Sequence, residues 1–579
     1  MLKECLEIFE NELHEKGENL ILDSYIPADG TYIVVSKINN KFQIKDEAIN
    51  IKYNKKTDEL EGRMNTLYED ICFYDYNSKL VDMNKPIDKK KIIQSNNYLS
   101  FFIKKDSLTN GKLTVERIDQ YYDTLANPYL KYTDSKTKEI YKEIEEELGE
   151  IDKDNIKEIR NWIKENIFNL NIEIKGKDYL KIFFEFPRDL YEKEGRRYLI
   201  PNIFNSNDFN IKINNEIVGL PNNNMGLNSK KPYLENKSRK NTIPYLLNSK
   251  EVKLQKKFFD YLLNCASAGK VNIYLNDKGI KALKNSELPD EIFSGIFLRV
   301  KKGKEAEIHL FDIITGYNPK VKKIFVLKDV CNMENKELIK ESYGVFRSKK
   351  SIQEILDSVL FSKYLKNNYF TEPGEISIND GVLLSSLLIS RNAVFNWLYK
   401  GKENGVYTIL NKVSLNIIKG SINKGFLSKS KHQFNLICSI NEYFNGGINM
   451  ADKLNEIRRD LREKINFSET KYISSDEEYY FAVGQLINYL LSKSKGKNKP
   501  QSLVNPFINA KNNLFIKEKL LALYKKYNYD IEIKSKAKRF NNLYTMILGY
   551  EPLSEVNQNM IIAGYLNSSL IYEKSEEEK

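Results

Sequence analysis

The sequence predicts an α+β N-terminal portion followed by an all-α C-terminal helical bundle. Up to about residue 340, short alternating or continuous apolar runs are interspersed with helical patterns, which is typical of a mixed α/β region. Beyond residue 340, apolar residues recur at intervals of three and four, which indicates helices. A chain of 579 residues also exceeds one compact core, so two to four domains are expected.

The N-terminal portion contains one clear helix, several strands and a hairpin. Residues 1–17 place Leu2, Cys5, Leu6, Phe9 and Leu13 on one helical stripe. Strands are predicted at residues 32–35, 42–44 and 179–186. A hairpin is predicted from residues 296–300 and 305–311, because strand alternation continues on both sides of a turn that contains glycine.

Helical periodicity dominates the remaining residues. Helices are predicted at 351–369, 381–399, 406–422, 433–444, 451–465, 476–492, 513–527, 537–548 and 557–572. Ser475 and Glu478 have the spacing of a capping box before one of them. The predicted domains are therefore a mixed α/β region that binds nucleic acid and anchors a complex (1–340), a helical region (341–449) and a C-terminal bundle (450–579).

The net charge of +12 permits a polyanionic partner without demanding one. Lysine and asparagine are residues of AT-rich codons, so part of this composition reflects the genome. The N-terminus lacks the unbroken apolar core of a signal peptide. No stretch approaches the roughly 18 apolar residues of a membrane helix. We therefore expect a cytoplasmic protein with no membrane partner.

Motifs of the common enzyme classes are missing from the sequence. It contains neither a GxxxxGK[ST] phosphate loop nor a GxGxxG turn after a strand. Its three histidines and five cysteines are far apart and include no CxxC pair. We expect no catalytic residues, no metal and no cofactor. The alternative is a stand-alone nucleic-acid-processing enzyme with a divergent metal-dependent site.

Pro289-Asp290 followed by Glu305 and Glu307 imitates a metal-dependent nuclease core. Such a core requires a lysine where Glu307 stands, because a glutamate would repel the attacked phosphate. We therefore interpret Glu305, Glu307 and His309 as the solvated face of a strand.

The segment from Gly219 to Asn241, GLPNNNMGLNSKKPYLENKSRKN, combines asparagines with a dense positive charge. Five basic residues and one acid between Lys230 and Lys240 give a net charge of +4 over eleven residues. Prolines and glycine predict a loop, in which asparagines suit base edges and lysines suit phosphates. An ordinary connecting loop beside a solvated basic face is the alternative interpretation.

A second basic stretch extends from Ser78 to Leu108. Lys89, Lys90 and Lys91 precede an aromatic run with Tyr98, Phe101 and Phe102. Basic residues interleaved with aromatic ones suit RNA or single-stranded DNA. The alternative, favoured for Phe101 and Phe102, is a core element approached by lysines.

Two stretches, DMNKPIDKKKIIQSNNYLSFFIKK and NNNMGLNSKKPYLENKSRK, resemble the large subunit of type I-B CRISPR Cascade. The opening DSYIPADGTYIVV and the helical C-terminus resemble the same family. The resemblance implies a non-catalytic subunit that recognises the protospacer-adjacent motif in double-stranded DNA and helps to open the duplex. It also implies that the subunit recruits a helicase-nuclease for antiviral defence. The implied partners are CRISPR RNA, target DNA, and the Cascade backbone and small subunits.

The resemblance also implies roles for individual residues. Asn222, Asn223 and Asn224 would read the motif from the minor groove, whose code is dominated by acceptors. Lys230, Lys231, Lys237, Arg239 and Lys240 would contact phosphates. Lys89, Lys90 and Lys91 would contact the RNA or a neighbouring subunit.

Met450 is a candidate internal start of translation. In the family that the chain resembles, the small subunit can be made from within the large-subunit gene. Gly446 and Gly447 can encode a ribosome-binding sequence two codons before Met450. An ordinary glycine helix terminator is the alternative. The segment from residue 450 to residue 579 has the length and pattern of an independent bundle.

Overall fold

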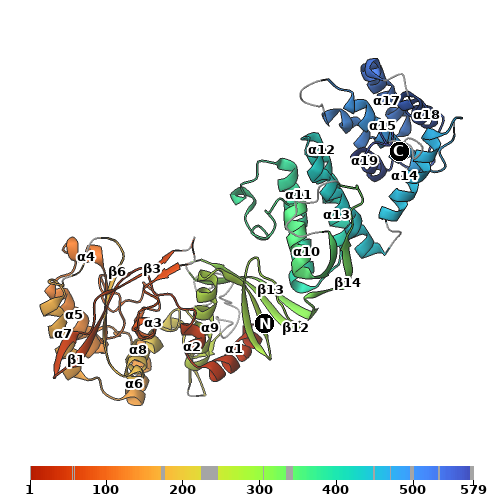
Figure 1. The fold of residues 1–579 in the computed structure, drawn as a ribbon. Helices are drawn as coiled ribbons and strands as arrows, with labels where there is room; N and C mark the ends of the chain where they lie inside the picture. Colours follow the sequence, from red (N-terminus) through yellow and green to blue (C-terminus); the bar gives the residue numbers. More distant parts are fainter. Residues whose placement is uncertain are drawn as a thin grey trace. The chain divides into compact units, whose positions relative to one another are not determined.

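Two compact units make up the chain (Figure 1). The computed structural model describes residues 2–54, 57, 59–170, 172, 176–214, 216–222, 246–303, 305–333, 343–446, 450–469, 471–495, 501–531 and 535–573. The first unit is Met1–Lys284 with Gly295–Ile313, and the second is Asn285–Ser294 with Ile314–Lys579. The predicted fold class is confirmed, because a mixed α/β region precedes a region of helices.

The larger sheet of the first unit has the strand order β4-β3-β1-β6-β5, with β2 also paired to β1. Its strands are β1 (Gly30–Ile38), β2 (Lys41–Ile44), β3 (Ile49–Asn54), β4 (Glu59–Glu61), β5 (Ser100–Lys104) and β6 (Tyr179–Phe184). Only β1 and β6 are parallel, so the sheet is mixed. These two strands are the most deeply buried, as expected for continuous apolar runs inside a sheet.

Helices cover both faces of this sheet. The helices of the first unit are α1 (Leu2–Lys16), α2 (Asn19–Leu22), α3 (Tyr68–Ser78), α4 (Lys105–Thr109), α5 (Val115–Ala126), α6 (Ser135–Leu148), α7 (Lys153–Asn166), α8 (Arg188–Asn202) and α9 (Ser249–Ser267). Successive residues of β6 point to opposite faces. Phe183 contacts Tyr74 of α3, whereas Phe184 contacts Trp162 of α7.

Of two further sheets, one lies in the first unit and the other has the ends of two of its strands, residues 293–294 and 314–317, in the second unit. The latter sheet has the order β11-β10-β12-β13, from β10 (Lys270–Asn276), β11 (Gly279–Lys284), β12 (Phe293–Lys302) and β13 (Ala306–Tyr317). Its β12–β13 pair confirms the predicted hairpin, and α1 confirms the predicted first helix. The former sheet is small, with the order β7-β8-β9, from β7 (Ile211–Ile213), β8 (Glu216–Gly219) and β9 (Leu247–Asn248).

The second unit joins a two-stranded sheet to a series of helices. The strands are β14 (Lys320–Leu327) and β15 (Gly344–Ser348). The helices are α10 (Lys349–Ile355), α11 (Gly381–Lys400), α12 (Val406–Asn423), α13 (Leu427–Asn445), α14 (Met450–Asn466), α15 (Asp476–Ser492), α16 (Asn505–Ile508), α17 (Asn513–Tyr527), α18 (Ser535–Leu548) and α19 (Gln558–Leu566). The predicted bounds of α15 and α17 are confirmed to the residue.

The predicted helix at 351–369 is wrong in its second half. After α10, one π-helical turn (Leu356–Leu360) ends the helix. The chain then reverses direction. Asp357 stabilises this reversal, because its Oδ1 accepts the backbone N–H of Leu365 at 2.8 Å and that of Lys366 at 3.2 Å. The reversal uses the left-handed region at Ser362 and Lys363. Residues 344–348 also form a strand, although they lie beyond the predicted start of the helical region.

The cap predicted for α15 is confirmed in part. Ser475 Oγ accepts the backbone N–H of Glu478 at 3.2 Å. In a capping box the Glu478 carboxylate would accept the backbone N–H of Ser475. It instead accepts the N–H of Ser474, one residue earlier, at 2.7 Å.

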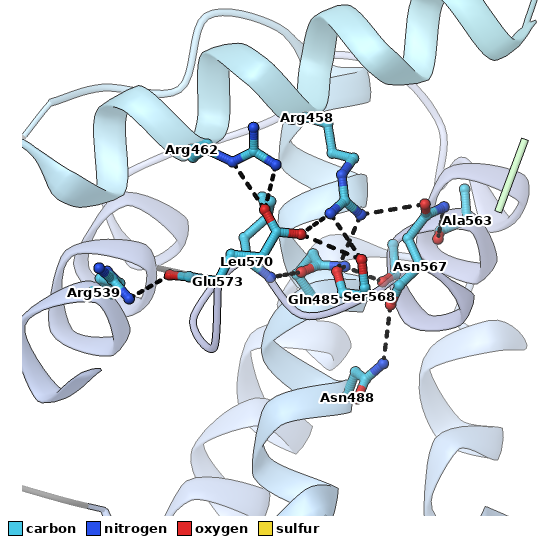
Figure 2. Close-up of polar contacts among 11 residues, drawn as sticks. Arg458, Arg462, Gln485, Asn488, Arg539, Ala563, Asn567, Ser568, Leu570 and Glu573 are labelled. Atoms are coloured by element: carbon cyan, nitrogen blue, oxygen red, sulfur yellow. Dashed lines mark hydrogen bonds and ion pairs between the residues drawn. The ribbon is translucent and has the colours of Figure 1, made fainter. Parts of the chain in front are cut away.

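Polar side chains bind the segment that follows α19 (Figure 2). Arg458 and Arg462 of α14 both bind the Glu573 carboxylate. Gln485 of α15 donates to the carbonyl oxygen of Gly564 at 2.6 Å and accepts the backbone N–H of Leu570 at 2.8 Å. These bonds replace helical ones, so α19 ends at Leu566 and does not reach the predicted residue 572. All of these donors and acceptors lie between Met450 and Glu573.

Candidate nucleic-acid interface

The Asn-rich basic segment connects two neighbouring strands. Gly219 ends β8, and the chain returns in β9, where Leu247 pairs with Gly219. Asn223, Asn224, Lys230, Lys231, Lys237, Arg239 and Lys240 lie outside the described residues. Asn222 is described and half-buried, and its backbone N–H donates to the carbonyl oxygen of Ile203 at 3.0 Å. The segment therefore leaves and re-enters the fold at adjacent positions.

Residues 202–205, which we name the support strip, hold the start of this segment. The Asn205 N–H donates to the Leu220 carbonyl oxygen at 2.8 Å, and Phe204 forms a β-bridge with Pro221. Ile203 and Phe204 are buried against α6 and α9. At Gly219, an added Cβ would lie 2.6 Å from the Phe204 ring. An added Cβ would also lie 2.1 Å from Asn210 Oδ1, so only glycine allows the backbone to approach these side chains.

Lys89, Lys90 and Lys91 lie in a turn built around Asp88, which we name the basic turn (residues 88–93). Asp88 is buried, and its carboxylate accepts three backbone N–H groups, those of Lys90 at 3.0 Å, Ile92 at 2.8 Å and Ile93 at 3.1 Å. The three lysines are exposed. Their ammonium groups make no hydrogen bond or ion pair within the described part of the chain, so they are available to an anionic partner.

Lys85, three residues before the basic turn, is bonded to the support strip. Its ammonium donates to the carbonyl oxygen of Asn202 at 2.9 Å and to that of Phe204. The Tyr198 hydroxyl donates to the Lys85 carbonyl oxygen at 2.8 Å, and Lys131 donates to the Pro86 carbonyl oxygen at 2.6 Å. The two basic segments singled out by the sequence are thus bonded to the same four residues.

The lysines next to the basic turn, Lys85 and Lys131, are not paired with carboxylates of the described residues. The pKa of both the Lys85 and the Lys131 ammonium is lowered to about 8, chiefly by burial and, for Lys131, also by neighbouring Lys89. Both ammonium groups bind carbonyl oxygens rather than carboxylates. A phosphate placed nearby would favour their charged forms.

The aromatic residues after the basic turn belong to the core. Tyr98, Phe101 and Phe102 are 2%, 0% and 3% exposed. Phe101 packs against Tyr121 and Tyr122 of α5. Stacking of bases on these rings is therefore wrong as a prediction, and the alternative of a core element is confirmed.

The nuclease-like residues lie on the exposed face of β13 or next to it. Glu305, Glu307 and His309 are exposed, which confirms the solvated face. No group of three His, Cys, Asp or Glu side chains among the described residues could hold a metal ion. The five cysteines are buried and form no disulfide. Within the described chain, none of the helices is both long and apolar enough to span a bilayer.

Sequence analysis overlooked Lys85, Asp88 and Lys131. Asp88 had a signal, because an Asp side chain that accepts the N–H two residues later is a common turn motif. Lys85 and Lys131 had none, because their partners are backbone carbonyls whose positions only the fold decides.

Neither a family model, nor a curated protein, nor a solved structure matches this chain.

Proposed function

We propose that this chain is the non-catalytic large subunit of a type I-B CRISPR Cascade complex, and that its first unit holds DNA beside the protospacer. One observation carries the proposal beyond sequence resemblance. Lys85, three residues before the basic turn, and Leu220 and Asn222, at the start of the Asn-rich basic segment, are bonded to one support strip. Two basic segments on a common support suit a backbone with regularly spaced phosphates.

The proposed division of roles follows the chemistry of the side chains. Asn222, Asn223 and Asn224 would donate to acceptors in the minor groove. Lys230, Lys231, Lys237, Arg239 and Lys240 would neutralise phosphates of the same duplex. CRISPR RNA would supply target identity by base pairing, as in other RNA-guided effectors. A recruited helicase-nuclease would cut the opened DNA.

Motif discrimination by the reconstituted complex tests this proposal. Asn222→Ala, Asn223→Ala and Asn224→Ala together should abolish the difference in affinity between DNA with a correct and with a wrong adjacent motif. Assembly with CRISPR RNA should be unaffected. Unchanged discrimination would show that another loop reads the motif. Asn169→Ala, an exposed position in the same unit, is the control for loss of an asparagine.

Incubation of the purified chain with Mg²⁺ or Mn²⁺ and nucleic acids tests the non-catalytic role. The proposal predicts no cleavage of double-stranded DNA, single-stranded DNA or RNA. Cleavage that co-purifies with the chain and is lost in Glu307→Gln would contradict it and favour a metal-dependent nuclease.

A further inference from the structure

A cavity opens in the first unit between the end of α3, α8 and the first half of α9. It encloses about 60 Å³, room for roughly four to six water-sized groups. Five cationic side chains line it, those of Lys79, Arg196, Lys253, Lys256 and Lys257. Two carboxylates, Glu18 and Glu192, also line it. The lining is therefore predominantly basic.

Helix packing and sequence spacing bring these cations together. Lys253, Lys256 and Lys257 are three and four residues apart, so they share one face of α9. Gly195 lets α8 approach α3, since an added Cβ would lie 2.6 Å from the Asn77 carbonyl oxygen. This approach places the neighbouring Arg196 in the cavity wall.

Of the acidic side chains nearby, Glu18 and Asp260 are bound by lysines of the lining, whereas the exposed Glu192 makes no ion pair within the described part of the chain. Glu18 binds Lys257, and Asp260, behind the cavity, binds Lys256. The Tyr76 hydroxyl also donates to Asp260 at 3.0 Å. The Lys79 ammonium lies 3.7 Å from the Asp260 carboxylate, beyond hydrogen-bond distance. Burial lowers the pKa of the Lys79 ammonium to about 8 in spite of Asp260.

Two donors in the cavity wall lack a partner. The Lys253 ammonium makes no hydrogen bond or ion pair with any residue of the described chain. Burial lowers its pKa, and Lys257 and Arg196 lower it further. Arg196 binds Glu147 through Nη2 at 2.6 Å, whereas its Nε is buried with no acceptor among the described residues. An acceptor-only ligand would satisfy both donors.

We infer that this cavity binds a phosphate group. A phosphate offers several oxygen acceptors, which match an arginine Nε–H and a cluster of ammonium groups. Its negative charge would balance Lys253, and the cavity has room for its five heavy atoms. The inference does not rest on the proposed function, because inorganic phosphate alone provides this chemistry.

Thermal unfolding of the full chain with inorganic phosphate tests the inference, with sodium chloride at equal ionic strength as the reference. Phosphate at ten times its Kd should raise the Tm of the transition that contains the first unit by roughly 2 °C. Lys253→Met should remove this response. The variant itself should melt no lower than the wild type, because it removes an unpaired, partly buried charge and keeps the aliphatic stem. Lys278→Met, on an exposed turn, should keep the full response.

An equal response in the wild type and in Lys253→Met would overturn the inference. So would a wild-type response no larger than that to chloride. Oligonucleotides with and without a 5′-phosphate distinguish the sources of the ligand. If only the phosphorylated oligonucleotide competes with inorganic phosphate, the natural ligand of the cavity is the phosphorylated end of a nucleic acid. If neither oligonucleotide competes, the ligand is a free phosphate. Each of these two results supports phosphate binding by the cavity.

Discussion

At the scale of single residues, Asp88 decides how Lys89, Lys90 and Lys91 are presented. Its buried carboxylate accepts three backbone N–H groups of the basic turn and lies 3.3 Å from Nη1 of Arg117. Among the described residues, nothing bonds to the three ammonium groups, so the positions of these lysines depend on the backbone that Asp88 fixes.

Asp88→Ala should therefore weaken binding of DNA even though it makes the turn more positive. The loss of acceptors for buried N–H groups should lower the free energy of unfolding by about 2 kcal/mol. Chemical denaturation and DNA titration measure the two effects. Asp82→Ala removes an acid that accepts the exposed Asn84 N–H, and as the control it should change both values little. Tighter DNA binding by Asp88→Ala would show that charge alone matters.

Four buried lysines make stability depend on pH. Burial lowers the pKa values of Lys79, Lys85, Lys131 and Lys349 to about 8. An unfolded lysine titrates near 10.4, so the unfolded state binds more protons as the pH approaches 8. The free energy of unfolding should therefore rise between pH 7 and 8. At higher pH the opposite effect sets in, because burial raises the pKa of the cysteines, which keep their protons in the folded state and lose them in the unfolded state. Denaturant titrations at several pH values measure the slope, and Lys85→Met should reduce it. A slope that is flat or negative below pH 8 in the wild type would contradict these pKa values.

Residue-scale features differ in how far sequence predicts them. Charge density marked Lys89, Lys90 and Lys91, and they are exposed. Lys85 has the same residue type and lies four positions away, yet it is a buried donor to two carbonyls. Nothing local separates the two cases, because the carbonyls belong to residues more than 110 positions later in the chain.

At the scale of elements, α15 and α19 pack with almost no separation. An added Cβ at Gly564 would lie 2.0 Å from the Phe481 carbonyl oxygen, and one at Gly484 would lie 2.2 Å from that of Ile561. The two glycines therefore let the helix backbones touch, and no side-chain rotation can make room.

Gly564→Ala should destabilise the C-terminal helices by about 3 kcal/mol, since the clash is with backbone and demands separation of the helices. Circular dichroism during thermal unfolding measures the change. Gly549→Ala is the control, because its Cβ would meet only one atom at 3.4 Å. Equal stability of the two variants would mean that the helices are not this close.

Helical periodicity predicted most of these elements and misjudged two of them for one reason. Apolar spacing continues past Leu360 and past Leu566, so the pattern alone extends both helices. The chain leaves helical geometry where a side chain supplies the hydrogen bonds that the next turn would have made, Asp357 in one case and Gln485 in the other. Such side-chain substitutions for backbone bonding depend on tertiary contacts.

At the scale of the whole molecule, the described residues from Met450 to Glu573 contain a polar network of their own. Helix α14 begins at Met450, the candidate internal start. Arg458, Gln485 and Arg539 bind residues 564–573 from α14, α15 and α18, so a chain that starts at Met450 keeps this network (Figure 2).

If translation also starts at Met450, expression of the gene should yield a short co-purified product that begins at this residue. Met450→Leu should remove it and leave the full chain folded, because leucine retains helix propensity and apolar volume. Mass spectrometry of the purified material identifies the product. A short product of unchanged mass and amount in Met450→Leu would exclude internal initiation at this codon.

The central claim is that the basic turn contacts a nucleic-acid backbone, and the salt dependence of affinity, measured for RNA and for DNA, tests it most directly. In Lys89→Ala/Lys90→Ala/Lys91→Ala, the slope of log affinity against log salt should fall by about 0.9 for each phosphate that the variant no longer neutralises. The control Lys153→Ala/Lys157→Ala/Lys278→Ala removes as many exposed lysines from α7 and from the turn between β10 and β11, and should keep the wild-type slope. Identical slopes in the two triple variants would contradict the claim.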